Sequence, residues 1–188
     1  MTGKTYKTAV VIIPPLEIWP SIQAIRQKHD RHFRRWMPHI TLLYPFLPRS
    51  LFPSVAEQLA CVCARLQPFQ IELAQFRFFH HGRSGYTLWL APEPHETLAE
   101  LQTTLWQVVP KCDDVRRYGR GFTPHLSVGQ ARKENTMKQL LLELQGAWRS
   151  ICFSMSAISL IWRNDPPDDV FRVEHTIELG SSLSSGTV

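Results

Sequence analysis

The sequence has no long apolar run, and this absence excludes several classes of protein. No hydrophobic stretch approaches the roughly 20 residues that a membrane-spanning helix needs. Lys4 and Lys7 are followed only by the short apolar run 9–13 before Pro14 and Pro15, too little for the core of a secretory signal. We therefore expect a soluble cytoplasmic protein with no membrane partner.

Cysteine is also scarce, and its spacing is not that of a metal site or a disulfide framework. The chain has Cys61, Cys63, Cys112 and Cys152, of which only the first two are close in sequence. Residues two apart on a helix point away from each other, so Cys61 and Cys63 cannot easily share a metal ion or a disulfide. Free, buried thiols are the expected state.

The chain does have enough apolar material for a core. Its 188 residues are 44% hydrophobic and 11% aromatic, with 20% charged residues, which is the composition of a globular protein. The length suits one compact unit, or two small lobes of roughly 90 residues each. A net charge of +5 and a pI near 9.2 favour an anionic partner such as nucleic acid, nucleotide or a membrane surface.

Hydrophobic periodicity and turn residues predict an α+β order of elements that occurs twice. An offset of 82 positions aligns the apolar residues of 69–79 with those of 151–161. Ser54 and Glu57 have the spacing of a helix-capping box. The expected strands are 10–13, 39–46, 69–74, 76–80, 86–91, 125–129, 151–155, 157–162 and 171–179, and the expected helices are 21–29, 54–66, 95–109 and 134–144.

This repetition predicts one domain, residues 1–180, built of two similar lobes. The approximate repeats are 8–81 and 86–163, the segment 170–179 is a closing strand, and residues 181–188 are expected to be a disordered tail. Two such lobes would face each other across a groove, a natural place for a ligand. An ordinary α+β fold could also produce this similarity between the two halves by chance.

Histidine followed two positions later by Ser or Thr occurs three times, and two copies match closely. The third, at residues 95–97, lies at an expected helix start, where Glu and Thr are ordinary residues. Residues 38–42 and 124–128 both read Pro-His-aliphatic-hydroxyl-aliphatic. Each copy stands at the same place in its repeat, which favours a shared function over two unrelated structural histidines.

Side chains two positions apart on a strand share a face. We therefore expect His39 beside Thr41 on one face and His125 beside Ser127 on another, with Tyr44 on the opposite, core-facing side of its strand. Two imidazoles and two hydroxyls across a groove supply two proton-transfer groups and two neutral donors around one phosphate. A histidine pKa near 6.5 lets one ring be neutral and the other protonated near pH 7.

The paired motifs resemble the two His-x-Ser/Thr signatures of the two-histidine (2H) phosphoesterase superfamily, which includes 2′–5′ RNA ligase-like proteins and cyclic phosphodiesterases. The element order is similar to that family over residues 8–179. The resemblance implies a bilobal, pseudo-two-fold α+β fold, with two antiparallel sheets lining a central cleft and helices outside. It also implies that His39 and His125 are catalytic, that Thr41 and Ser127 bind phosphate, and that no metal or cofactor is needed.

The expected activity is metal-independent hydrolysis of a 2′,3′-cyclic phosphate on a nucleotide or RNA end, with 2′–5′ cleavage or ligation as the related reaction. One histidine would take a proton from water while the other gives one to the leaving ribose oxygen. The sequence leaves open which ring is the acid. The alternative is a non-catalytic RNA-end or nucleotide-binding module that uses the same cleft. We expect no obligate protein partner, and a monomer.

Basic residues gather just before each motif, at 26–35 and 116–120. Such runs are usually solvated loops, and on the functional interpretation they draw a polyanion toward the cleft. Trp36, Tyr118 and Phe122 are candidates for stacking on a base, and Arg163 is a candidate phosphate contact.

A zinc-dependent hydrolase is a third interpretation. His80 and His81 could join Cys61 or Cys63 at a metal, but no further ligand stands at suitable spacing. His175, in an alternating strand pattern, is expected to be an ordinary strand residue.

Overall fold

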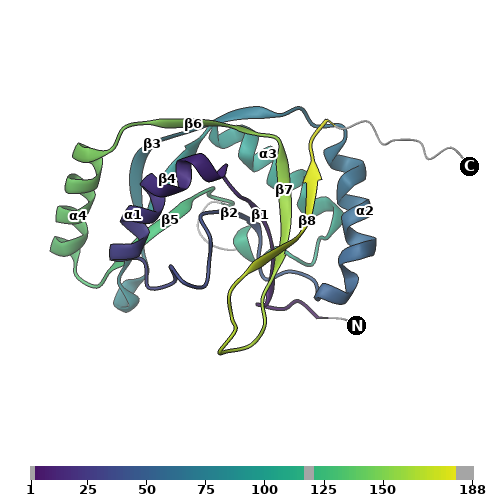
Figure 1. The fold of residues 1–188 in the computed structure, drawn as a ribbon, viewed down its shortest axis with the longest axis horizontal. Coiled ribbons are helices and arrows are strands. Elements are labelled where there is room, and N and C mark those ends of the chain that lie inside the picture. Colours follow the sequence, from purple (N-terminus) through teal and green to yellow (C-terminus); the bar gives the residue numbers. More distant parts are fainter. Residues whose placement is uncertain (1–2, 117–120, 181–188) are drawn as a thin grey trace, which may run out of the picture.

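A computed structural model describes residues 3–116 and 121–180 as an α+β fold with two four-stranded antiparallel sheets (Figure 1). The sheet orders are β2-β1-β7-β8 and β5-β4-β3-β6. The strands are β1 (Thr8–Ile12), β2 (Ile40–Leu43), β3 (Phe69–His80), β4 (Tyr86–Glu93), β5 (Leu126–Ala131), β6 (Ile151–Met155), β7 (Ala157–Trp162) and β8 (Arg172–Glu178). The helices are α1 (Trp19–His29), α2 (Phe52–Cys63), α3 (His95–Val108) and α4 (Glu134–Ala147). The predicted fold class is confirmed.

The two sheets have the same arrangement of strands, and each contains a central strand from the other half of the chain. Strands β2 and β5 each lie at an edge, and β1 and β4 lie next to them. β3 continues from the first half into the second sheet, and β7 from the second half into the first. Where β3 meets β6, Ile71 lies opposite Phe153, the residue 82 positions later. A residue opposite its own repeat equivalent marks a two-fold axis. The exact repeat boundaries stay a prediction.

Two elements differ from their predicted form. Residues 69–80 make one strand instead of two, with a register irregularity between Leu73 and Gln75, because β3 pairs with β6 along its first part and with β4 along the rest. The predicted capping box at Ser54 is wrong. With Pro53 in its first turn, α2 already begins at Phe52, and the Ser54 hydroxyl donates to the carbonyl of Leu51.

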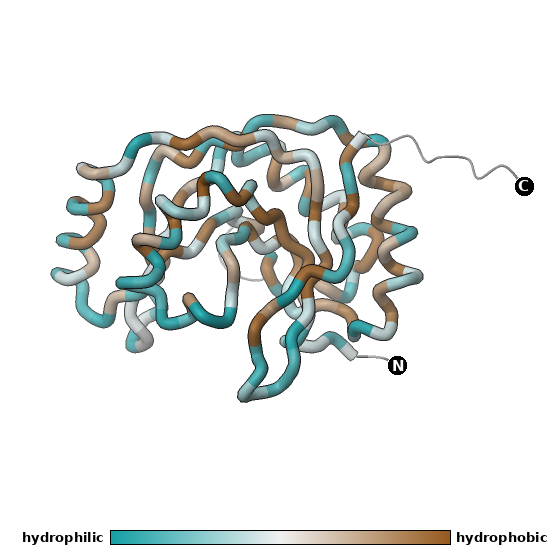
Figure 2. Tube along the Cα trace, viewed as in Figure 1, coloured by the Kyte–Doolittle hydropathy of each residue, from teal (hydrophilic) through white to brown (hydrophobic). Residues whose placement is uncertain are grey.

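The first sheet is covered on both faces, as the alternation along β1 shows. Val10 and Ile12 belong to the main core under the helices, whereas Ala9 and Val11 belong to a smaller cluster on the opposite face. Figure 2 shows hydrophobic residues gathered along the inner strands. Ile161 and Phe171 complete the small cluster, and Trp36, Met37 and Tyr44 pack against it. The small cluster therefore lies beneath the segment that carries His39.

Each histidine-bearing strand is supported by a helix from the other half of the chain. α1 follows β1 yet packs against β5, and α3 follows β4 yet packs against β2. α4 packs against β3, β4 and β5, and α2 packs against β8 and α3. Within the described ranges, no helix is long and apolar enough to cross a bilayer.

The four cysteines are free, as predicted, but only two are buried. Cys63 and Cys112 lie in the core, where burial raises the pKa of each thiol to about 11. Cys61 and Cys152 are exposed, which corrects the expectation of four buried thiols. Cys152 lies on β6, an edge strand whose outward side chains meet solvent.

Candidate active site

The two matched motifs meet where edge strands β2 and β5 contact each other. His39 stands directly before β2, and His125 directly before β5. Both histidines are half-buried, and so are Thr41 and Ser127, while the residues between and beside them are fully buried. Each histidine and its hydroxyl thus share the less buried face of their strand, as the spacing predicts.

Each histidine ring is fixed by a hydrogen bond to the backbone two residues earlier. The Nδ1–H of His39 donates to the carbonyl of Met37 at 2.7 Å, and the Nδ1–H of His125 donates to the carbonyl of Thr123 at 2.8 Å. A carbonyl oxygen can only accept, so the neutral rings carry their protons on Nδ1. Both rings therefore keep Nε2 as the atom that accepts a proton from, or returns it to, a bound molecule.

Aromatic side chains pack the two rings in different ways. Trp36 stacks on His39, with 4.5 Å between centroids and 15° between planes, and stacks in turn on Phe171 at 3.7 Å. His125 meets Phe79 edge-on at 5.0 Å. His39 is therefore held by a flat stack, and His125 by a ring edge.

Burial keeps His39 neutral. It lowers the pKa of His39 from 6.5 to about 4, against the hydrogen bond to Met37, which raises it. This value includes smaller contributions from the charges of Arg26 and His125, which lower the pKa, and from the carboxylate of Asp30, which raises it. His39 is therefore unprotonated near pH 7 before any ligand binds.

His125 is affected in the same direction. Burial lowers its pKa below 6.5, the hydrogen bond to Thr123 opposes this, and the nearby His81 lowers it further. Desolvation thus favours the neutral form of both rings in the ligand-free protein, and the expectation that one ring is neutral and the other protonated stays a prediction. An anionic phosphate beside a ring favours its charged form, so a ring can take up a proton from solvent when such a ligand binds.

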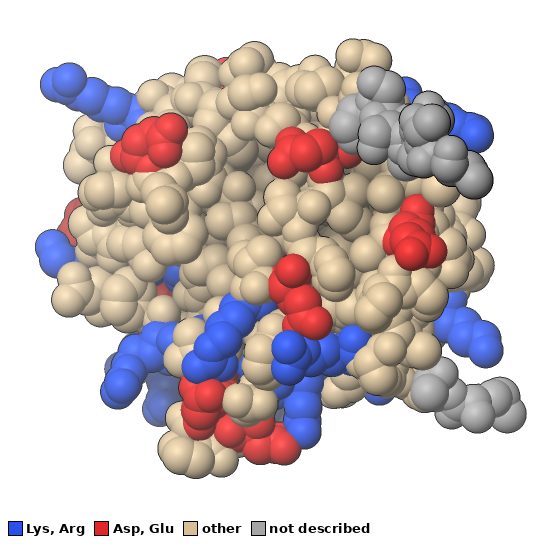
Figure 3. Space-filling model, turned by 45° about the vertical axis from the view of Figure 1, so that its right-hand side comes forward, with Lys and Arg blue, Asp and Glu red and all other residues tan. Residues whose placement is uncertain are grey.

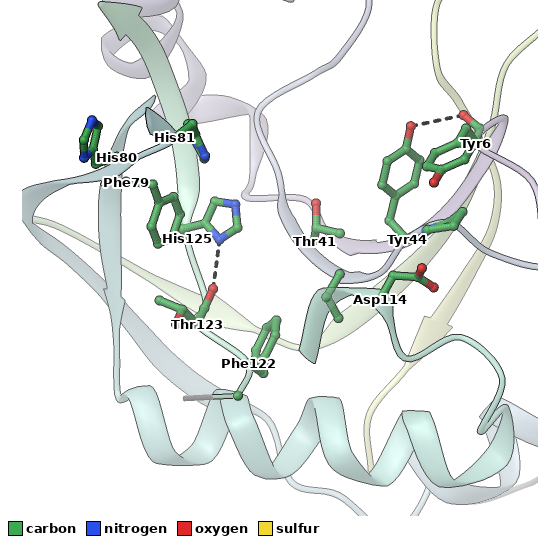
Figure 4. A pocket seen from close by; sticks show the side chains of 13 residues that line it. Tyr6, Thr41, Tyr44, Phe79, His80, His81, Asp114, Phe122, Thr123 and His125 are labelled. Carbon is green, nitrogen blue, oxygen red and sulfur yellow. Dashed lines mark hydrogen bonds between the residues drawn. The ribbon is translucent and has the colours of Figure 1, made fainter. Parts of the chain in front are cut away.

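A cavity of about 680 Å³ opens beside His125 and Thr41 (Figure 4), within the size range of small-molecule sites. Figure 4 shows Thr41 across from the His125 ring, with Tyr44 beyond it. Among the described residues, His39 and Ser127 do not line this cavity. Its other walls are made by Tyr6, Tyr44, Pro45, Phe79, His80, His81, Asp114, Val115, Gly121, Phe122 and Thr123.

Tyr44 lies in the cavity wall and not on the core side where simple alternation predicts it. Along β1, Val10 pairs with Leu43 and the next residue, Val11, pairs with Thr41. This bulge places one extra residue in β2, so two consecutive leucines are buried and Tyr44 turns toward the cavity. Its hydroxyl donates to the carbonyl of Tyr6 at 3.2 Å.

The residues proposed for substrate contact have different outcomes. Phe122 lines the cavity. Trp36 packs between His39 and Phe171, so its ring faces are occupied by protein. Arg163 does not line the cavity, and its guanidinium carbon is 5.6 Å from the Phe171 ring centre. Burial raises the pKa of the Tyr44 hydroxyl, and the charge of Arg163 lowers it by a smaller amount. Tyr118 lies outside the described residues.

Several described residues of the two basic clusters already have protein partners, while residues 117–120 of the second cluster lie outside the described residues. Arg26 is only 2% exposed and pairs with Asp30, and Arg35 pairs with Asp169. Arg116 stacks on Trp106 with 4.4 Å from its guanidinium carbon to the ring centre. Figure 3 likewise shows basic and acidic side chains interleaved on the lower part of one face. Arg26 therefore cannot contact a polyanion, because it is buried.

Residues 3–116 and 121–180 contain no group of three or more His, Cys, Asp or Glu placed to hold a metal ion. His81 lies within hydrogen-bond distance of the Thr87 hydroxyl, at 3.1 Å, and His80 stacks on Tyr86. The cysteines suggested as their co-ligands lie on α2, away from these contacts. Catalysis without a metal stays a prediction.

Tyr6, Phe79 and Asp114 are among the cavity residues that sequence reasoning missed. No local pattern could have located Tyr6, because its place depends on an isolated bridge between Thr5 and Phe46. Phe79 reads as an ordinary strand residue. Asp114 begins a short 3₁₀ turn and pairs with Lys4, a contact between residues 110 positions apart.

The chain belongs to the 2′-5′ RNA ligase superfamily, whose family model matches residues 14–167. It is 28% identical over 127 residues to "Putative phosphoesterase GK0864" of Geobacillus kaustophilus, covering 66% of this chain and 69% of that protein. A protein of Oceanobacillus iheyensis with the same class of name is 25% identical over 140 residues, covering 74% and 79%. The 2H resemblance drawn from the paired motifs is confirmed.

Solved structures share the fold. The protein TT0787 of Thermus thermophilus superposes with a TM-score of 0.61 at 18% identity, covering 93% of this chain and 98% of its own. LigT of E. coli, solved with 3′-AMP, also has a TM-score of 0.61, at 16% identity, covering 95% and 100%. At these identities the likeness shows the fold alone.

Proposed function

We propose that this protein is a phosphoesterase that hydrolyses the 2′,3′-cyclic phosphate of a nucleotide or RNA end by acid–base catalysis from His39 and His125. One observation carries the proposal. Two strands with the same Pro-His-aliphatic-hydroxyl pattern meet at the edges of their sheets, and each histidine is held through Nδ1 so that Nε2 is left for proton transfer. Superfamily membership and the names of the relatives support the reaction class.

The reaction needs one proton removed and one supplied. The base takes a proton from water at Nε2 as the water oxygen bonds to phosphorus. The bond from phosphorus to one ribose oxygen breaks, and the acid protonates that oxygen. Burial lowers the pKa of both rings, so either can act as the base in the free protein. The other ring would then be the acid, protonated when the phosphate anion binds beside it.

The hydroxyls of Thr41 and Ser127 would donate hydrogen bonds to the non-bridging phosphate oxygens. Negative charge on these oxygens grows in the transition state, so neutral donors already in place stabilise it without first having to reorganise. Thr41 lines the cavity, and Ser127 lies on the same half-buried face as His125.

The cavity suits a nucleoside attached to that phosphate. Its volume is about 680 Å³, and its walls include the rings of Tyr6, Tyr44, Phe79 and Phe122. Bases stack on aromatic rings without strong sequence preference. LigT of E. coli, which has this fold, has been solved with 3′-AMP, ATP and NADP+, which supports nucleotides as the ligand class.

The same groups could run the related 2′–5′ reaction, with a ribose hydroxyl in place of water. A binding module that lacks turnover is the alternative from another class. It is disfavoured because binding alone would not need two histidines held through the same ring atom.

One experiment tests the proposal. The protein, His39→Ala and His125→Ala are incubated with 2′,3′-cyclic nucleotides and with short 2′–5′ and 3′–5′ RNAs, with and without EDTA. We expect EDTA-insensitive turnover of the cyclic phosphate and a loss of at least about 1,000-fold in either variant. Binding with no turnover of any substrate would favour the module, and activity abolished by EDTA would contradict the metal-free mechanism.

A further inference from the structure

Arg26 is a buried charged group whose guanidinium makes hydrogen bonds to three different residues. Its Nε donates to the carboxylate of Asp30 at 2.9 Å, and its two terminal nitrogens donate to the side chain of Gln23 at 3.0 Å and to the carbonyl of Trp36 at 2.9 Å. Arg26 thus ties the end of α1 to the segment that leads into the His39 strand.

The second oxygen of Asp30 continues this network to the other lobe. Its Oδ1 accepts from the backbone N–H of His32 at 2.9 Å and from the side-chain amide of Gln130 at 3.1 Å. The Gln130 carbonyl oxygen accepts from the backbone N–H of Arg31 at 3.0 Å. Gln130 lies on β5, three residues after Ser127, so it bridges the strand of His125 to the end of α1.

Close backbone packing supports the same junction. A Cβ placed on Gly129 would lie 2.7 Å from the Cβ of His29 and 3.1 Å from its carbonyl oxygen. No side chain larger than hydrogen fits there without movement. The end of α1 therefore rests directly on β5.

The other end of the network reaches His39. Arg26 donates a hydrogen bond to the carbonyl of Trp36, and the Trp36 ring stacks on the His39 imidazole. A continuous path of contacts thus runs from β5 through Gln130, Asp30, Arg26 and Trp36 to His39.

Stability alone is a weak reason for this arrangement. Burying an arginine and a carboxylate costs desolvation energy that their attraction often only balances, and an apolar pair of similar volume is commonly as stable. The directional hydrogen bonds do something that an apolar pair cannot, because they fix two separate segments at set distances. Catalytic groups need to be held within about 0.5 Å of productive geometry.

We propose that Arg26, Asp30 and Gln130 are positioning residues that hold the His39 segment and the His125 strand in register for acid–base catalysis. This inference rests on the proposed function. None of the three lines the cavity, so they act through Trp36 and β5 and not through the substrate. The charged and titratable groups acting on His39 are Arg26 and Asp30 from the end of α1 and His125 from the other lobe.

Gln130→Ala is the principal test, because it cuts the bridge without leaving a buried charge unpaired on α1. We expect kcat on 2′,3′-cyclic nucleotides to fall by about 10- to 100-fold with KM changed less than about threefold, since misplaced groups lose rate while the cavity still binds. Gln139→Ala is the matched control, since Gln139 is an exposed glutamine bonded to Glu143 on α4, and it should leave both constants unchanged.

Gln130→Glu separates positioning from simple space filling. It keeps the size of the side chain but replaces the amide donor with a carboxylate facing Asp30, so we expect a loss at least as large as in Gln130→Ala. Wild-type activity in Gln130→Glu would overturn the proposal.

NMR titration of the histidine side chains gives a readout that does not depend on turnover. Gln130→Ala should shift the titration of His39, whose charged neighbours it releases, and Gln139→Ala should not. If the wild-type protein cleaves no substrate, the proposed function fails, and the titration then shows separately whether Gln130 positions the His39 segment. Unchanged His39 and His125 titrations in a folded Gln130→Ala protein would overturn it.

Discussion

At the scale of single residues, the proposed chemistry depends on one ring nitrogen of each histidine. Backbone carbonyls two residues earlier hold the Nδ1 protons of His39 and His125. Desolvation then keeps both rings unprotonated near neutral pH. The ligand-free protein is thus ready to accept a proton, and an anionic ligand would complete the acid–base pair.

The stability of the protein should fall on mild acidification. Unfolded His39 binds a proton below about pH 6.5, while the folded ring does so only near pH 4, so the unfolded state holds more protons between these values. The contribution of His39 to the free energy of unfolding should therefore be constant above about pH 6.5 and fall between about pH 6.5 and 4. At pH 5 the free energy of unfolding should be about 2 kcal/mol lower than at neutral pH.

Urea unfolding at several pH values measures this effect. His39→Gln should show a flatter dependence than the wild-type protein, with the remaining slope coming partly from His125. Equal slopes in both proteins would mean that His39 has an ordinary pKa in the folded state.

The hydroxyls should matter for rate more than for affinity. Thr41→Val keeps the shape of the side chain but removes the donor, so we expect kcat on a cyclic nucleotide to fall by about 10- to 100-fold. Thr41→Ser retains the donor and should keep most of the activity. Steady-state kinetics of the two variants decide the matter, and equal losses in both would indicate that Thr41 acts by packing.

At the scale of elements, each histidine strand is supported by a helix from the opposite half. The contact of α1 with β5 is the tightest of these at Gly129. A strand at the edge of a sheet has one side without a backbone partner, so the helix against it limits how far it can move.

Gly129→Ala should therefore destabilise the protein. The added Cβ would lie 2.7 Å from His29, and relieving this overlap should cost about 1–3 kcal/mol. Gly146→Ala is the matched control, because Gly146 lies in α4 with open space around the new Cβ. That change should raise stability by about 0.5–1 kcal/mol. Thermal unfolding of both variants tests the pair, and equal melting temperatures would contradict the close contact.

At the scale of the whole molecule, the pseudo-two-fold arrangement brings two equivalent strands together but gives them unequal surroundings. In the first lobe, the Trp36 ring stacks on both His39 and Phe171. In the second lobe, Phe79 contacts His125 edge-on. Each motif also contributes only one of its two polar residues to the cavity: Thr41 and His125 line it, whereas His39 and Ser127 do not. In the proposed mechanism, this asymmetry would allow two similar histidines to take different roles.

The pH dependence of the reaction reflects the whole site. Both histidines have pKa values lowered by burial, so kcat/KM should follow a bell whose optimum lies below pH 6.5. The kcat profile should lie at higher pH, because the bound phosphate raises the pKa of the acid. Initial rates over about pH 4 to 9 measure both, and an optimum of kcat/KM above about pH 7.5 would contradict neutral, desolvated rings in the free protein.

The sequence by itself determined the α+β class, the paired histidine motifs and the face that each motif presents, because strand periodicity and local repetition are written in neighbouring residues. Only the tertiary structure decided which strands change sheets, that Tyr44 turns toward the cavity at a bulge, and that Arg26 is buried. Each of these depends on pairing between distant segments, such as Gln130 with Asp30 or Val11 with Thr41. The tertiary structure also decided the lowered histidine pKa values, because the rings lose water only when the chain folds.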